Sequence, residues 1–230
     1  MIQQNKGKLI VIEGGDGSGK GTQAALLLEY LKKNNIPHAS VDFPDYESLY
    51  GKIIARFLRG EFGNLEEVSP YFVGTLFGLD RSLHKETLQK HLQDGKIVVA
   101  NRYVTSNMAH QGSKIVDPQK LSTFIQWLEN FEYNILGLPR EDLVIYLYVP
   151  WQIALQLTKT KEKRTYLQGE SEDIQEKDEK HRQDTETMYQ LLASKHNHWH
   201  TLACSKDGTI LSREEIHAEV LRILQKNLVI

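Results

Sequence analysis

The chain has 230 residues, of which 40% are hydrophobic, 25% charged and 9% aromatic, a balance that excludes a disordered tail, a collagen-like chain and a membrane bundle. It carries 28 basic and 30 acidic side chains, which gives a formal charge of −2. No overall positive field therefore favours nucleic acid as a partner, and any anion must be bound locally.

The cysteine content and the apolar runs indicate where the protein works. The single cysteine, Cys204, forms no disulfide within the chain, which favours a reducing, cytoplasmic setting. One of the longest apolar runs, Leu143–Trp151, is far shorter than the about 20 residues of a membrane-spanning helix. We therefore expect neither export nor a membrane partner.

Short runs rich in Val, Ile and Leu alternate with longer helical stretches, a pattern that predicts βαβ units around a parallel sheet. The continuous apolarity of the strands indicates burial on both faces, so the predicted fold class is α/β. The predicted strands are Lys8–Glu13, His38–Phe43, Lys96–Asn101, Asp142–Val149 and Trp199–Cys204. The predicted helices are Gly19–Lys33, Tyr71–Leu92, Pro118–Leu136 and Ser212–Gln225, the last with Ser212 as N-cap.

The chain is predicted to form one domain over residues 1–230, because no Pro, Gly or Ser linker divides it and no solenoid-like repeat is visible. One segment, residues 159–178, has almost no apolar side chains and changes from basic to acidic along its length. We expect this segment to be a mobile surface excursion outside the core.

A glycine-rich run follows the first predicted strand and opens the first predicted helix, which is the setting of a phosphate-binding loop. Its backbone N–H groups, the helix N-terminus and the Lys20 ammonium together make a site for a polyphosphate. Gly21 stands where the strict pattern has Ser or Thr, which weakens the expectation of a magnesium-binding hydroxyl. The expected nucleotide-binding residues are Gly14, Gly15, Gly17, Ser18, Gly19, Lys20, Gly21 and Thr22.

The loop sequence GGDGSGKGTQ resembles that of nucleoside monophosphate kinases, and later segments narrow the resemblance to thymidylate kinases. The resemblance implies a doubly wound α/β fold of the P-loop kinase type, with about five strands and helices on both sheet faces. It also implies transfer of the terminal phosphoryl group of ATP to dTMP with Mg²⁺, and a homodimer. The segments that carry it are Phe43–Tyr46, Leu58–Gly63, Thr75–Arg81 and Asn101–Asn107.

The chemistry of such a reaction places two phosphorylated molecules side by side, so cations from several segments are needed. The attacking phosphate oxygen is ionised near neutral pH, because that second pKa is about 6, and no protein base is required. Lys20 is expected to face the transferred group. Arg102 follows a predicted strand and projects from its carboxyl end, and by resemblance it binds the acceptor phosphate.

Further roles come from the resemblance. Phe77 and Arg81 lie one helical turn apart and face the same way. In the family, the residue that matches Phe77 stacks on thymine, and the residue that matches Arg81 forms a hydrogen bond with the base. Asp16 is an unexpected acid in an anion-binding loop, and its family counterpart accepts a hydrogen bond from the sugar 3′-hydroxyl. The resemblance adds Phe43 and Tyr46 beside the acceptor phosphate and Ser106 and Asn107 at the base.

The basic run at residues 159–164 begins the expected lid, a segment of about residues 159–178. Family members whose loop lacks an arginine usually carry the transition-state arginine in the lid, and because this loop has Gly17, Arg164 is the candidate. Asp173 matches an acid at the end of the lid that holds the substrate. Lys20, Arg102 and Arg164 are thus the expected catalytic cations.

Three positions depart from the family pattern. Asn101 stands where most members have an aspartate beside the metal, so the expected magnesium ligands are Asn101 and the nearby Glu13, and both Glu13 and Asp16 are acids that could act through water. His110 stands where a tyrosine guards against a ribose 2′-hydroxyl, and it is expected to line the sugar pocket. Gln175 stands where some members have a lid tyrosine.

These departures leave alternatives open. His110 makes a kinase for another nucleotide, or for UMP, conceivable. Asn101 makes conceivable a nucleotide-binding regulator that has lost catalysis. A GTPase switch is disfavoured because the chain has no Asn-Lys-x-Asp guanine motif and Gly21 replaces the magnesium hydroxyl.

Overall fold

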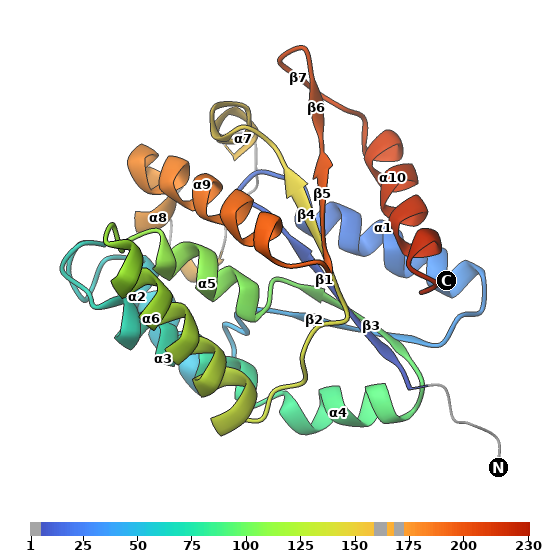
Figure 1. The fold of residues 1–230 in the computed structure, drawn as a ribbon, viewed down its shortest axis with the longest axis horizontal. Helices are drawn as coiled ribbons and strands as arrows, with labels where there is room; N and C mark the ends of the chain where they lie inside the picture. Colours follow the sequence, from blue (N-terminus) through green and yellow to red (C-terminus); the bar gives the residue numbers. More distant parts are fainter. Residues whose placement is uncertain (1–5, 159–164, 168–172) are drawn as a thin grey trace.

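The structure is a computed structural model that describes residues 6–158, 165–167 and 173–230. Five parallel strands form the central sheet in the spatial order β2-β3-β1-β4-β5 (Figure 1). The predicted α/β class is confirmed, and every predicted strand agrees with an observed one to within one residue at each end. The strands are β1 (Lys8–Glu13), β2 (His38–Asp42), β3 (Ile97–Asn101), β4 (Leu143–Tyr148) and β5 (Trp199–Ala203).

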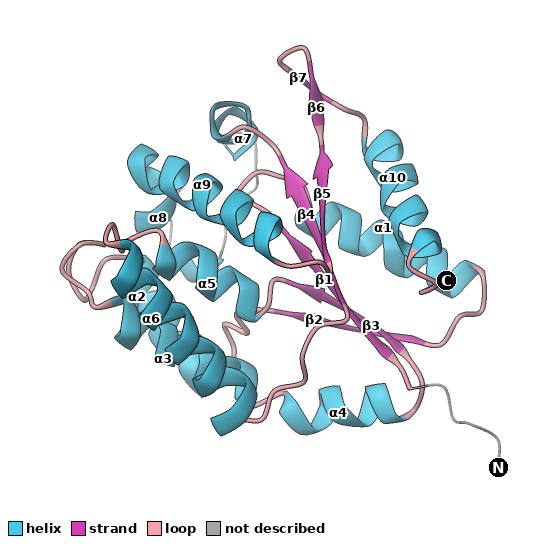
Figure 2. Cartoon of the chain, in the orientation of Figure 1, coloured by secondary structure: helices cyan, strands magenta, loops and turns pink. Residues whose placement is uncertain are grey.

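Helices cover both faces of the sheet, as Figure 2 shows. Side chains of β1 alternate between two apolar clusters because successive residues of a strand point to opposite faces. Leu9 and Val11 pack with the helices on one face, and Ile10 and Ile12 with those on the other. The second face is covered by α1 (Lys20–Lys33) and α10 (Arg213–Lys226).

The first face carries most of the remaining helices. They are α4 (Lys85–Gln93), α5 (Val104–Gly112), α6 (Pro118–Glu129) and α9 (Glu179–Lys195). A third cluster joins α2 (Leu49–Leu58) to α3 (Pro70–Ser82). Shorter elements are α7 (Trp151–Thr158), α8 (Ile174–Lys177), the π-helical turn η1 (Asn130–Ile135), the 3-10 turn η2 (Thr165–Leu167) and the hairpin of β6 (Ser205–Lys206) and β7 (Thr209–Ile210).

The N-cap prediction at the last helix is confirmed. The Ser212 hydroxyl accepts a hydrogen bond from the backbone N–H of Glu215, and the Glu215 carboxylate accepts one from the Ser212 N–H. This reciprocal capping box stabilises the first turn of α10 by satisfying N–H groups that have no partner within the helix.

Two predicted helices are wrong in extent. The predicted helix Tyr71–Leu92 is interrupted after Ser82, and a new helix starts at Lys85. The intervening His84 turns its ring toward the Asp45 carboxylate at 3.1 Å, a contact from a distant segment that local periodicity does not register. The predicted helix Pro118–Leu136 is α-helical only to Glu129 and continues as a π-helical turn.

The expectation of a surface excursion over residues 159–178 is wrong for the part that the structure describes. Leu167, Asp173 and Glu176 are buried, with exposed fractions of 1%, 6% and 1%. Their polar groups find partners inside the protein, so a low apolar content does not keep this stretch out of the packed structure. The lid residues 159–164, Arg164 among them, lie outside the described residues.

The strand order places a crevice at the carboxyl edge of the sheet. From β1 the chain passes first to β2 and β3 on one side, and later to β4 and β5 on the other. In open parallel sheets ligands bind at such a switch point, outside the carboxyl ends of the strands. None of the described helices is both long and apolar enough to cross a membrane.

Candidate active site

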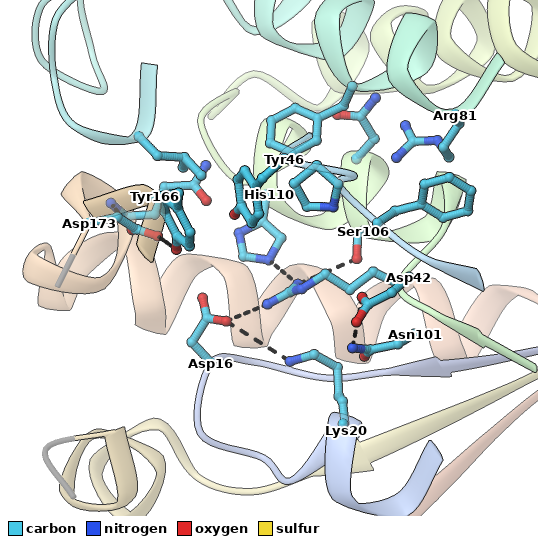
Figure 3. A pocket seen from close by; sticks show the side chains of 18 of the residues that line it. Asp16, Lys20, Asp42, Tyr46, Arg81, Asn101, Ser106, His110, Tyr166 and Asp173 are labelled. Atoms are coloured by element: carbon cyan, nitrogen blue, oxygen red, sulfur yellow. Dashed lines mark hydrogen bonds and ion pairs between the residues drawn. The ribbon is translucent and has the colours of Figure 1, made fainter. Parts of the chain in front are cut away.

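A cavity of about 420 Å³ lies at this edge of the sheet, and Figure 3 shows the side chains that converge on it. Its size is that of a small-molecule site. The predicted residues that line it are Asp16, Gly17, Gly19, Lys20, Gly21, Thr22, Phe43, Tyr46, Phe77, Arg81, Asn101, Arg102, Ser106, Asn107, His110 and Asp173. The other lining residues are Asp42, Pro44, Leu58, Gln111, Tyr166 and Gln175.

The phosphate loop connects β1 to α1. At Gly17 the backbone has φ +94°, and a β-carbon there would lie 2.2 Å from the carbonyl oxygen of Ala154, so no side chain fits. Gly19 is the N-cap of α1 in the left-handed conformation, and no side chain caps the helix. The N–H groups at the start of α1 are therefore left for an anionic ligand.

Lys20 projects from the first turn of α1 and is 7% exposed. Its ammonium donates hydrogen bonds of 2.8 Å to the carbonyl oxygens of Gly14 and Gly15. It also lies 4.0 Å from the Asp16 carboxylate. The loop thus holds a buried cation at its centre, which suits a phosphate chain.

Arg102 comes directly after β3 and has φ +66°, which is unusual for a residue with a side chain. This conformation turns the guanidinium back over the sheet edge, where Nη2 donates to Asp16 Oδ1 and Nη1 donates to His110 Nε2 at 3.1 Å. Burial lowers the pKa of Arg102, but the Asp16 carboxylate outweighs that effect and raises it. Arg102 therefore remains a cation in the cavity.

His110 and His181 are both neutral at neutral pH. Burial and the Arg102 charge hold the pKa of His110 well below its ordinary value, and burial lowers the pKa of His181 to about 4. Because arginine only donates, His110 Nε2 must accept, which leaves the Nδ1–H to face His181 Nε2 at 3.4 Å. This tautomer is inferred from the hydrogen-bond network.

Arg81 and Asn107 are held by one buried carboxylate, that of Glu132 on η1. Arg81 donates to Glu132 through Nε and Nη2, both at 2.6 Å, and both residues are almost fully buried. Asn107 Nδ2 donates to Glu132 at 2.8 Å and to the Gly74 carbonyl at 2.9 Å, which leaves its Oδ1 buried without a hydrogen-bond partner among the described residues. This amide therefore presents an acceptor, and Phe77 lines the cavity nearby.

Glu13, one of the two expected metal ligands, does not line the cavity. It is fully buried, and its carboxylate accepts hydrogen bonds from the hydroxyl groups of Thr105, Ser106 and Tyr189 and from the backbone N–H of Tyr103. With these donors around it, Glu13 ties β1 to α5 and α9. Ser106 was expected at the base, but its hydroxyl donates its hydrogen bond to the Glu13 carboxylate.

The wall opposite the loop contains a tyrosine pair. The rings of Tyr46 and Tyr166 stack with centroids 4.0 Å apart and planes inclined by 15°. The Tyr166 hydroxyl donates to Asp173 at 3.2 Å, and Asp173 also caps α8. Burial, followed by the influence of Tyr166, raises the pKa of Tyr46 well above its ordinary value, so its hydroxyl stays protonated.

Asn101 and Asp42 meet at the ends of neighbouring strands. They are register partners of β3 and β2, and Asn101 Nδ2 donates to Asp42 Oδ1 at 3.0 Å. Partial removal from water raises the pKa of the Asp42 carboxyl, although the hydrogen bond from Asn101 and the charges of Arg102 and Lys20 oppose the rise.

Sequence reasoning missed three of these residues. Asp42 lies one residue before the end of the predicted strand His38–Phe43 and ends the observed β2. Its position beside Asn101 depends on the order of the strands in the sheet, which the apolar pattern alone does not provide. Glu132 stands in a π-helical turn, where helical spacing does not apply. Tyr166 stood out as an aromatic side chain in a polar segment, and that contrast was the available signal. Among the expected loop residues, Gly14, Gly15 and Ser18 support the loop without lining the main cavity.

Comparison with known proteins places this geometry in a family. The family described as Thymidylate kinase matches residues 12–216. The chain is 32% identical over 187 residues to thymidylate kinase of Mycobacterium tuberculosis (81% of this chain and 86% of that protein), and 36% identical over 147 residues to that of Plasmodium falciparum (64% of each). A solved thymidylate kinase from Candida albicans shares the fold, with a TM-score of 0.74 at 21% identity, covering 97% of this chain and 93% of that one. The chain belongs to the thymidylate kinase family.

Proposed function

We propose that the protein transfers the γ-phosphoryl group of ATP to dTMP, giving ADP and dTDP. The observation that carries this proposal is that one cavity joins the phosphate loop with Lys20 to Arg102 and to the base-facing pair Arg81 and Asn107. Donor and acceptor phosphates would meet between Lys20 and Arg102. Family membership supports the same reaction.

The acceptor end explains how the protein would catalyse the step. The acceptor phosphate supplies its own ionised oxygen, so the protein acts by alignment and charge stabilisation. The guanidinium fork of Arg102 suits a phosphate, and Phe43 and Tyr46 close the wall beside it. Asp16 pairs with Arg102, and this ion pair holds the Asp16 carboxylate in place. The carboxylate would accept the hydrogen bond from the sugar hydroxyl in that position.

The base end favours a pyrimidine with a ring N–H beside a carbonyl group. Asn107 Oδ1 is an acceptor by virtue of its fixed amide, and Arg81 keeps Nη1 for donation because Nε and Nη2 are bound to Glu132. The N3–H and O4 of thymine match this pair. Cytosine N3 carries no hydrogen, so with dCMP two acceptors, cytosine N3 and Asn107 Oδ1, would face each other.

Magnesium is the expected companion of ATP, and it would shield the charges of the β- and γ-phosphates. Asn101 fits such a role, because its buried Oδ1 has no hydrogen-bond partner within residues 6–158, 165–167 and 173–230, and its side chain lines the cavity beside the loop. Glu13 is held by hydrogen-bond donors within the wall, so we propose Asn101 and not Glu13 at this position.

Arg164 is proposed as the cation that approaches the transferred group. The support is that the loop leaves no room for an arginine at Gly17, where the carbonyl of Ala154 blocks a side chain. Arg164→Ala should lower kcat by about 10³-fold with a small change in the KM for dTMP. Lys163→Ala, which removes the neighbouring charge, serves as control, and equal kcat values for the two variants would contradict the assignment.

We further propose a homodimer and a cytoplasmic setting. The dimer is supported by the aromatic surface of α3, where Tyr71 and Phe72 are 39% and 48% exposed. The cytoplasmic setting is supported by the lone, buried Cys204.

The test is a panel of nucleoside monophosphates with ATP and Mg²⁺. Purified protein should release ADP with dTMP and form dTDP, and turn over dCMP poorly. No product with dTMP, together with turnover of UMP or another monophosphate, would overturn the assignment. Nucleotide binding without turnover of any monophosphate, even in Asn101→Asp, would instead identify a regulator.

A further inference from the structure

Asp42 stands at the carboxyl end of β2, beside the end of β3, in a position that the reaction described so far does not use. It is the register partner of Asn101, and the two side chains are joined by a hydrogen bond of 3.0 Å (Figure 3). Both line the cavity, as do Lys20 and Thr22 of the phosphate loop. A β-carbon at Gly21 would lie 4.0 Å from Asn101 Nδ2, so this pair lies against the start of α1.

The hydrogen bond fixes what each side chain offers. Asn101 donates from Nδ2 to Asp42, and its Oδ1 is buried with no hydrogen-bond partner in the part of the chain that the structure describes. Asp42 receives a hydrogen bond from a neutral group, the Asn101 amide, while the backbone N–H of Phe43 donates to the backbone carbonyl oxygen of Asn101. A carboxylate accepts about four hydrogen bonds or metal contacts, so Asp42 retains capacity for another ligand. The pair is thus an oxygen-rich corner with one negative charge.

That charge has no contacting counter-ion in the part of the chain that the structure describes. The other loop-side acid, Asp16, pairs with Arg102 and lies 4.0 Å from Lys20, whereas Asp42 enters no ion pair among the described residues. The positive charges of Arg102 and Lys20 act on Asp42 without contacting it. A carboxylate with no cation in contact would repel the two phosphorylated substrates that the cavity is proposed to hold. A cation that arrives with the nucleotide removes this conflict.

Magnesium has the chemistry for this corner. It prefers oxygen ligands, keeps several waters, and is usually held by one or two carboxylates together with substrate phosphates. An amide oxygen alone supplies no charge. We propose that Asp42 is the carboxylate that binds the nucleotide-bound Mg²⁺, directly or through its waters, with Asn101 as the neutral oxygen beside it. This inference rests on the proposed function, and it makes Asp42 a magnesium-binding residue of the site.

The experiment measures metal binding without turnover. Mn²⁺ is titrated into the protein with the non-hydrolysable analogue β,γ-imido-ATP, and free Mn²⁺ is read by electron paramagnetic resonance. Asp42→Asn should weaken Mn²⁺ binding to the protein–nucleotide complex by about 10- to 100-fold. Asp94→Asn is the matched control, because Asp94 is exposed and lies before the amino end of β3, opposite the cavity. It should bind Mn²⁺ as the unaltered protein does.

A charge exchange separates metal binding from a purely structural link between the strands. The double variant Asp42→Asn with Asn101→Asp keeps one carboxylate and one amide but exchanges their strands, and it should recover most of the Mn²⁺ affinity. Unchanged affinity in a folded Asp42→Asn protein would overturn the proposal. Failure of the exchanged variant to exceed the Asp42→Asn protein would also overturn it, because the loss would then come from the altered strand ends.

The panel of monophosphates keeps the two proposals distinguishable. An unaltered protein that forms dTDP while Asp42→Asn binds Mn²⁺ normally contradicts the role of Asp42 alone. A protein that forms no dTDP contradicts the proposed function, whatever the Mn²⁺ titration gives. Melting curves recorded for each variant establish that the compared proteins are folded.

Discussion

At the scale of single residues, Glu132 sets the hydrogen-bonding groups that Arg81 and Asn107 present to the cavity, where the base is proposed to bind. Its carboxylate accepts from Arg81 and Asn107, so neither side chain is free to rotate. Burying such a pair is costly unless every polar group is satisfied, and removing one partner typically costs about 3–5 kcal/mol. Burying this carboxylate costs stability, but it fixes which atoms face the cavity: the Nη1 of Arg81 as donor and the Oδ1 of Asn107 as acceptor.

Glu132→Gln should weaken the choice of base. The glutamine amide has one oxygen for three donors, the Nε and Nη2 of Arg81 and the Nδ2 of Asn107. Its NH₂ group would face one of these donors, so Arg81 or Asn107 would lose a hydrogen bond and could rotate. We expect kcat/KM for dTMP to fall by about 10- to 100-fold, the range for one lost hydrogen bond to a charged group, while dCMP loses less.

Steady-state kinetics with both monophosphates measures this effect. Glu129→Gln removes the same charge near the end of α6, where Glu129 lies 3.9 Å from Arg140, and should leave the ratio of the two kcat/KM values unchanged. A folded Glu132→Gln protein with the ratio of the unaltered protein would show that the carboxylate does not set base choice.

His181 makes stability depend on pH. Its pKa is lowered from 6.5 to about 4, chiefly by burial and then by the charge of Lys114, while Asp178, Asp16 and Asp184 oppose the shift. Below about pH 6.5 the unfolded chain binds a proton that the folded chain does not, so stability falls between pH 6.5 and 4 and is unaffected above.

The loss amounts to about 3 kcal/mol at about 1.4 kcal/mol per pKa unit. Urea denaturation at pH 7 and pH 4.5 should show a smaller loss of unfolding free energy for His181→Gln than for the unaltered protein. The difference between the two proteins isolates this residue, because all other acids are common to both. Equal losses would mean that the histidine is protonated in the folded state.

At the scale of elements, the short turns complete the site. The π-helical turn η1 carries Glu132 under α3, and the 3-10 turn η2 carries Tyr166 onto Tyr46. A π-helical turn shifts the following side chains relative to an α-helix, and such turns often occur at functional sites. Each turn also buries an apolar side chain, Tyr133 in η1 and Leu167 in η2. Glu132 holds two residues that line the cavity, and Tyr166 lines the cavity itself.

Tyr166→Leu should raise the KM for dTMP by about 2- to 10-fold, because the stack with Tyr46 contributes about 0.5–1.5 kcal/mol beyond buried area. Tyr166→Phe keeps the ring and loses the 3.2 Å hydrogen bond to Asp173, so it should show a smaller rise. Isothermal titration with dTMP measures both affinities. If the phenylalanine variant is impaired as much as the leucine variant, the hydroxyl and not the stack supports the wall.

At the scale of the whole molecule, α3 carries two neighbouring aromatic side chains, Tyr71 and Phe72, that the packed chain leaves partly exposed. Tyr71 contacts Trp127 of α6 edge-on with centroids 4.7 Å apart, and Phe72 projects beside it with an exposed fraction of 48%. The helix also carries Phe77 and Arg81 of the site. An interface here would therefore stabilise a site-bearing helix.

Phe72→Glu should convert the proposed dimer into monomers, because a buried, unpaired charge in an interface is strongly unfavourable. Sedimentation velocity measures the change. Leu228→Glu is the control, because Leu228 is 89% exposed just after α10, on the other face of the sheet. An unaltered protein that sediments as a monomer would contradict the dimer, and a dimeric Phe72→Glu protein would place the interface elsewhere.

The sequence by itself determined the strands, the phosphate loop and most of the side chains at the cavity. Buried parallel strands have a local signature in continuous apolar runs, and a phosphate loop has one in its glycines and Lys20, so both are visible without tertiary contacts. Arg102 was expected at the site because it follows a strand whose carboxyl end faces the crevice, and Asn107 and Phe77 because their motifs resemble the family.

Tertiary structure alone decided the rest. The break after Ser82 and the π-helical turn at Glu132 arise from contacts between distant segments, which local periodicity does not encode. Strand order decided that Asp42 and Asn101 lie side by side, although 59 positions separate them. Hydrogen bonding decided that Glu13 is tied into the wall and that Asn107 presents its oxygen, because only the surrounding donors and acceptors fix which atoms of a side chain remain available.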